Sequence, residues 1–172
     1  MGSKTTPIGA VIRGVLAGAA GTALMDAVWY ARYRRDGGTS GLLAWETAAG
    51  LDSFEDAPAP AQVGKRVVEG LGQRELKPDK ARLMTNVVHW GYGLAWGAAY
   101  GIVAASTRRP RVTDGLLFGP MVWSTAYLVL PPTGIYQPMR HYDRRTLWKD
   151  ASAHLAYGVG AAASFKLLAG RR

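Results

Sequence analysis

Four segments of the chain are almost free of charged side chains, and polar residues separate them. No Asp, Glu, Lys or Arg occurs in residues 83–107, in residues 115–139 or in residues 151–165. Residues 14–31 contain one charged side chain, Asp26. Soluble helices usually carry charge along one face, whereas a bilayer core of about 30 Å needs roughly 20 apolar residues per helix. The pattern therefore predicts membrane-spanning helices at about residues 8–33, 82–106, 113–130 and 147–169.

The predicted fold is an all-α bundle of these four transmembrane helices, forming one membrane domain over residues 1–172. A long polar segment, residues 36–81, joins the first helix to the second. It contains a stiff Ala-Pro spacer at residues 57–61, and short amphipathic helices are expected at about residues 42–51 and 62–71.

The second of these short helices has a clear apolar face. Val63, Val67 and Leu71 share that face, opposite Lys65 and Glu69. Such a helix suits either the surface of a membrane or packing against the ends of the long helices. In the first short helix, Trp45-Glu46 could plug the outer surface of the bundle, or Trp45 could serve as a buried aromatic anchor.

Small residues recur at four-residue spacing within the predicted spans. In a soluble helix each glycine would cost about 1 kcal/mol relative to alanine, whereas in lipid such a row lets helix backbones approach closely. We expect helix contacts, within the chain or with a second copy in a homo-oligomer or membrane complex, at Gly14, Gly18, Gly93, Gly97, Gly101 and Gly160.

The formal net charge of +9 comes from arginine clusters beside the apolar segments. Arginines in this position anchor a protein to phosphate headgroups, which predicts an anionic lipid bilayer as the partner. The chain lacks a basic stripe with interleaved aromatic residues, so the sequence does not indicate nucleic-acid binding. The chain has no cysteine, which excludes disulfides and cysteine-metal sites.

Four spans place both termini on one side of the membrane. The basic residues expected on that side are Lys4, Arg171, Arg172 and the cluster at 108–111, and the positive-inside rule then favours cytoplasmic termini. Other arginines oppose this orientation, because Arg32, Arg34 and Arg35 and the group at 140–149 are expected on the far side.

The predicted helices place their few polar groups at a similar depth. Counting 1.5 Å per residue, Asp26, His89, Tyr127 and His154 fall about 5–10 Å below one membrane surface. A charged residue at the centre of a span costs about 2.5–3.5 kcal/mol, so such groups usually find partners. We expect His89 and His154 to approach each other or a carboxylate, and Asp150 to contact His154 one helical turn away.

Three interpretations of this polar cluster remain open. The first is hydrogen bonding between helices, which fixes their packing. The second is a proton- or solute-handling site, because histidine titrates near neutral pH. The third is a metal or haem site formed by His89, His154 and a carboxylate, although no HExxH or Glu-x-x-His pair supports it.

No catalytic motif occurs in the chain, and no cofactor is predicted. The sequence therefore favours a structural or accessory membrane subunit. The alternative is a small transporter, a proton- or solute-handling protein or a metal-dependent membrane enzyme working from the polar cluster.

Motifs in the second half of the chain are similar to those of a known family. They are Val88-His-Trp90, Gly115-Leu-Leu-Phe-Gly119, Pro131-Pro132 and the stretch from Trp148 to Gly158. Over residues 83–165 the chain resembles the YagU-type family of bacterial inner-membrane proteins, most specifically at Asp150, His154 and Tyr157. The resemblance implies a helical protein of the bacterial inner membrane and implies no substrate. Asp26 and the segment 36–81 have no counterpart in it.

Overall fold

The computed structural model describes residues 6–107 and 110–170 of the chain. Within these residues all regular secondary structure is helical and no strand occurs, which confirms the predicted all-α fold class. The four long helices are α1 (Pro7–Arg35), α4 (Ala81–Ser106), α5 (Gly115–Val129) and α6 (Arg144–Ala169). Lys4, Arg108, Arg109, Arg171 and Arg172, on which the predicted orientation partly depends, lie outside the described residues.

Two shorter helices lie in the polar segment between α1 and α4. They are α2 (Leu42–Glu46) and α3 (Ala59–Gly72). The prediction of a helix to residue 51 was wrong, because Ala48 has a positive φ of 49° and ends the helical path. The prediction of an extended spacer over residues 57–61 holds at Pro58 and is wrong from Ala59 onward, since Pro60 lies in the first turn of α3, where a proline needs no N–H.

Short 3₁₀ helices flank the long elements. Thus η1 (Pro78–Lys80) leads into α4, η2 (Val112–Asp114) leads into α5, and η3 (Pro131–Thr133) follows it. A fourth, η4 (Met139–His141), precedes α6, whose N-terminus is capped by Asp143 through a 2.9 Å bond from the Thr146 N–H.

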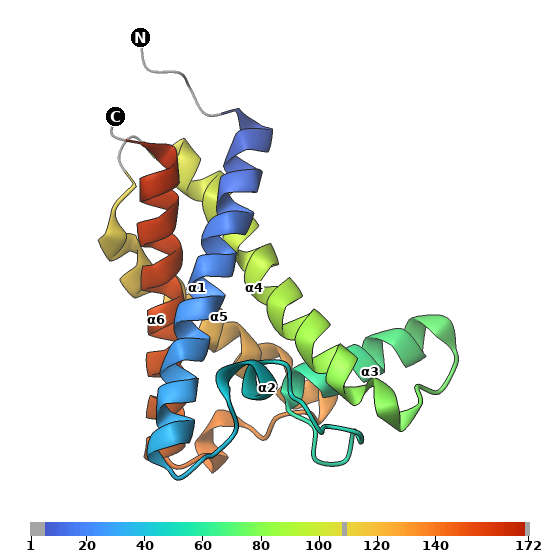
Figure 1. Cartoon of the computed structure of the whole chain (residues 1–172). Helices are drawn as coiled ribbons and strands as arrows, with labels where there is room; N and C mark the ends of the chain where they lie inside the picture. The colour runs from blue at the N-terminus through green and yellow to red at the C-terminus, as the bar shows by residue number, and fades with distance from the viewer. Residues whose placement is uncertain (1–5, 108–109, 171–172) are drawn as a thin grey trace.

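Helix α1 lies at the centre of the bundle. It packs against α4 on one side and against α6 on the other, and α5 packs against α6 (Figure 1). The start of α1 and the end of α6 lie at the same end of the bundle, while α2, α3 and the connection from α5 to α6 lie at the opposite end (Figure 1).

The contact between α1 and α4 depends on glycine. A Cβ added at Gly14 would overlap the carbonyl oxygen of Gly97, and one at Gly18 would overlap that of Gly93. A Cβ at Gly101 would meet the backbone of Ala10 and Gly14. The five glycines predicted in the first two spans thus face one another. Because α1 of the same chain fills the glycine face of α4, that face is closed to a second copy of the protein.

A second glycine contact joins α5 to α6. A Cβ at Gly115 or Gly119 would overlap the carbonyl oxygen of Gly158 or of His154, respectively. None of these three glycines was among the packing residues predicted above. The predicted Gly160 faces α1 instead, where a Cβ would lie 3.2 Å from the Cα of Gly21.

Aromatic side chains fill the remaining side of the bundle, between α4 and α5. The rings of Tyr100 and Phe118 have centroids 4.7 Å apart, and Phe165 packs against Tyr100 at 5.7 Å. Tyr157 completes the group, 5.7 Å from Phe118. Glycine therefore sets the close helix contacts, and large side chains form the core where two helices stand further apart.

Only α1, which has 29 residues and contains an 18-residue stretch with a mean hydropathy of 1.6, is long and apolar enough among the described helices to cross a membrane on those two criteria. Helix α5 has 15 residues, fewer than the roughly 20 that a bilayer core requires. Helices α4 and α6 have 26 residues each, but glycine, serine, tyrosine and histidine lower their mean hydropathy. Length and composition thus support one candidate span, not the predicted four.

Candidate functional site

Asp26 of α1 and His89 of α4 form a buried pair. The His89 Nε2 lies 2.9 Å and 3.0 Å from the two carboxylate oxygens of Asp26, which is 6% exposed. His89 stands one helical turn before Gly93, which packs against Gly18 of α1. The close backbone approach at these glycines therefore brings the carboxylate and the imidazole within hydrogen-bonding distance.

The short helix α2 contributes a second carboxyl group to this pair. Glu46 accepts a 3.0 Å hydrogen bond from the indole N–H of Trp90. Burial and the neighbouring carboxylate of Asp26 raise the pKa of Glu46, so its neutral form is favoured relative to an exposed glutamate. Glu46 is thus a member of the candidate site, whereas the sequence had indicated this residue only as part of a surface plug.

Aromatic packing holds α2 in place. The ring of Trp45 lies 5.4 Å from that of Tyr30 and 6.1 Å from that of Tyr33, both on the last turns of α1. On the other side, Arg82 of α4 donates a 2.8 Å hydrogen bond to the carbonyl of Thr47. These contacts support the anchoring role predicted for Trp45 and place Glu46 beside the buried pair.

A second polar group joins α5 to α6 around Asp150. One carboxylate oxygen accepts hydrogen bonds from the Tyr127 hydroxyl at 2.9 Å and from the Trp123 indole at 3.1 Å. The other lies 3.2 Å from the Nδ1 of His154, one turn further along α6. The predicted contact of Asp150 with His154 is therefore present, and Tyr127 adds a bond from the neighbouring helix.

Tyrosines of the α5–α6 connection cover this second group. The rings of Tyr136 and Tyr142 pack on Tyr127 at 5.2 Å and 5.4 Å. Burial, with a further contribution from the charge of Asp150, raises the pKa of Tyr136 to about 12. The sequence did not predict these two residues, because they lie in an irregular connection where periodicity gives no signal.

The two groups lie at a similar level along the bundle. Near the end of α1, Arg32 donates a 2.9 Å hydrogen bond to Ser152 of α6. Eleven residues earlier on α1, Gly21 faces Tyr157 of α6. Asp26 lies between these points and is therefore level with His154. The Tyr157 hydroxyl links the two halves further by donating a 2.7 Å bond to the carbonyl of Gly93.

The five polar residues predicted as one cluster are nevertheless divided into two groups. His89 binds Asp26, whereas His154 binds Asp150. In the part of the chain that the structure describes, no three His, Asp or Glu side chains are placed to hold a metal ion. The third interpretation, a metal site formed jointly by His89 and His154, therefore has no ligand set among the described residues.

Chemically, this arrangement binds helices together. Each carboxylate receives hydrogen bonds from aromatic or imidazole N–H or O–H groups of another segment or turn, which satisfies polar atoms that would be costly to bury alone. Comparisons of the chain with protein-family models, with curated proteins and with solved structures find no match.

Proposed function

We propose that this chain is a small multi-pass protein of the bacterial inner membrane, in which α1, α4, α5 and α6 all cross the bilayer. Large apolar side chains on the outward faces of these helices support the proposal, because patches of this kind mark lipid or protein contacts. The exposed side chains include Ile12 and Leu16 on α1, Val87, Ile102 and Val103 on α4, Leu117, Leu128 and Val129 on α5, and Leu167 on α6.

The low mean hydropathy of α4 and α6 is compatible with this proposal. Several of their glycines and tyrosines face neighbouring helices, as at Gly97, Tyr100 and Tyr157, which are all buried. Such residues lower the mean hydropathy of a helix without contacting lipid. The 3₁₀ helices at both ends of α5 extend its segment to residues 112–133, closer to the roughly 20 residues that a span requires.

We propose a structural or accessory role within the membrane. The observation that supports it is the pairing of Asp26 with His89 and of Asp150 with Tyr127, because both carboxylates already bind a side chain of another helix. Paired polar groups strengthen helix association in a bilayer by up to about 1–2 kcal/mol. The termini are proposed to face the cytoplasm, following the positive-inside rule.

A proton-flux assay tests this role against the proton-handling alternative. Proteoliposomes containing the protein should show the same passive proton flux as protein-free liposomes under an imposed pH gradient, followed with a trapped pH-sensitive dye. The reason is that in each pair the aspartate binds its own histidine. Helix α2 covers the first pair, and the tyrosines of the α5–α6 connection cover the second. The matched variants are His89→Gln in the buried pair and His141→Gln at an exposed position in η4.

A flux well above that of protein-free liposomes would contradict the structural role. If His89→Gln also removed that flux while His141→Gln preserved it, the buried pair would be identified as a proton-handling site.

A further inference from the structure

The first half of α3 packs against α4. Ala61 is fully buried, and a Cβ added at Gly64 would lie 3.0 Å from the side chains of Met84 and Val88. These small residues let the two helices cross closely. The contact fixes which face of α3 meets α4.

The same apolar face continues into the second half of α3, where it is exposed. Val67 and Val68 follow Gly64 by three and four residues, and Leu71 follows by seven, so all three extend the face that meets α4. Val67 is 52% exposed and Leu71 is 85% exposed. Figure 1 shows α3 projecting sideways from the long helices, so that its second half extends beyond α4.

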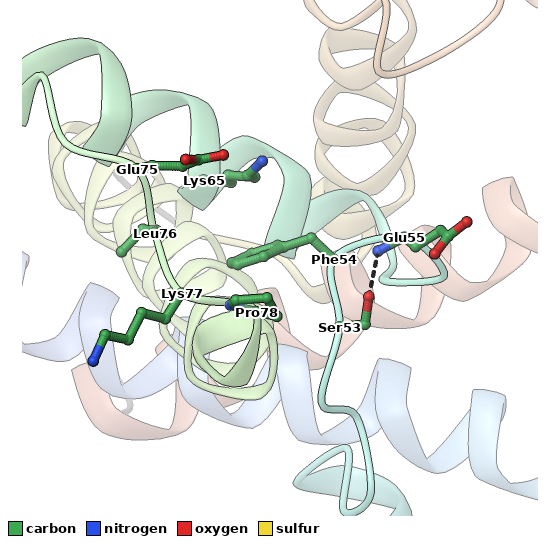
Figure 2. A pocket seen from close by; sticks show the side chains of 8 residues that line it. All are labelled: Ser53, Phe54, Glu55, Lys65, Glu75, Leu76, Lys77 and Pro78. Atoms are coloured by element: carbon green, nitrogen blue, oxygen red, sulfur yellow. Dashed lines mark hydrogen bonds between the residues drawn. The ribbon is translucent and has the colours of Figure 1, made fainter.

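The polar face of α3 is attached to the neighbouring connections. The Lys65 ammonium lies 5.6 Å from the ring centre of Phe54, and Glu69 accepts a 2.8 Å hydrogen bond from the N–H of Leu76. Figure 2 shows Phe54 and Lys65 beside an open pocket of about 400 Å³, which residues 75–78 also line. These attachments hold the polar face of α3 against the connections that precede and follow the helix.

The charges of the polar segment are divided along its length. Residues 36–58 contain five acidic and no basic side chains. Residues 59–82, which include α3 and the start of α4, contain six basic side chains and three acidic ones. Residues 59–82 therefore carry three more basic than acidic side chains, which suits a surface of anionic headgroups.

We propose that α3 is an interfacial helix, with Val67, Val68 and Leu71 inserted into the apolar edge of the bilayer and the basic residues between positions 66 and 80 at anionic headgroups. This inference rests on the proposed membrane location and adds a lipid-binding surface to it. An amphipathic helix that lies in the membrane plane with its apolar face buried combines these two contacts. The exposed apolar faces of α4 and α3 then form one continuous lipid-facing surface.

Fluorescence quenching in proteoliposomes tests the proposal on the cysteine-free chain. Single cysteines at Val67, Leu71, Leu117 and Asp52 are labelled with an environment-sensitive dye in vesicles of phosphatidylethanolamine and phosphatidylglycerol. Lipids with a nitroxide near the start of the acyl chain should quench the dye at Val67 and Leu71 about as strongly as at Leu117, which is 81% exposed on α5. The exposed loop position Asp52 should stay unquenched.

The four sites separate this inference from the proposal on which it rests. Quenching at Leu117 without quenching at Val67 and Leu71 would overturn the interfacial helix and keep the membrane span. Absence of quenching at all four sites would overturn both. Blue-shifted but unquenched emission at Leu71 would show that protein, such as a second copy, covers α3 and would also overturn the inference.

Lipid charge tests the headgroup contact. Replacing phosphatidylglycerol by a zwitterionic lipid should reduce the quenching at Leu71 and leave that at Leu117 unchanged. Equal quenching at Leu71 in both lipids would overturn the role of the basic residues.

Discussion

Substitution of Gly97 by leucine should destabilise the protein by about 1–3 kcal/mol, the usual cost of inserting atoms into a packed core. Gly97 lies where α4 crosses α1, and a Cβ there would overlap the backbone of Gly14 and Gly18. Because backbone atoms cannot rotate away as side chains do, the two helices must separate. Separation would also weaken the nearby pair of Asp26 and His89. Even Gly97→Ala should reduce stability.

Gly91 provides a matched control on the same helix. A Cβ at Gly91 meets no atom within 4 Å, and the residue is exposed. Gly91→Ala should therefore leave stability unchanged or increase it by up to about 1 kcal/mol, the difference in helix propensity. Thermal and denaturant unfolding of the purified variants in detergent measures both effects. Equal stability of Gly97→Ala and Gly91→Ala would show that α1 and α4 do not pack through glycine.

Asp26→Ala should destabilise the protein by about 1.5–3 kcal/mol, the typical contribution of a hydrogen bond to a charged group. The substitution removes both oxygens that bind His89 and leaves the imidazole without its partner from α1. Asp52→Ala, at an exposed position of the polar segment, should change stability by less than about 0.5 kcal/mol.

A double-mutant cycle isolates the pair itself. Because replacing both partners of a buried pair by apolar groups is often nearly neutral, Asp26→Leu combined with His89→Leu should recover much of the stability lost in either single variant. Additive losses in the unfolding free energy would contradict a direct interaction between α1 and α4 at this point.

The sequence allowed the long helices and one of their contacts to be predicted in some detail. The charge-free segments matched α1, α4 and α6 to within a few residues, because long apolar segments give strong periodic signals. The repeats around Gly14 and Gly97 predicted close packing, and the structure brings these two residues together. Helix α5 proved slightly shorter than expected, because η2 occupies the start of its predicted range and α5 ends at Val129, just before the prolines of η3.

The polar residues were harder to place. Counting residues gives depth along a helix, and Asp26 and His154 do lie at one level. Depth does not give the rotation of each helix about its axis, which decides the partner of a side chain. His89 therefore could not be assigned to Asp26 from the sequence alone. Glu46 was missed as a site residue because its place beside Asp26 depends on how the connection after α1 folds back onto α4.

Topology mapping tests the central claim, that four helices cross the membrane, most directly. Since the chain contains no cysteine, single cysteines can be placed at exposed positions between the helices and labelled in intact cells with a membrane-impermeant maleimide. The described ends and connections offer Thr6, Glu55, Thr107, Met139 and Gly170. Four crossings with cytoplasmic termini predict labelling of Glu55→Cys and Met139→Cys in intact cells and of the other three only after lysis. Equal labelling of Glu55→Cys and Thr107→Cys in intact cells would contradict the four-span arrangement.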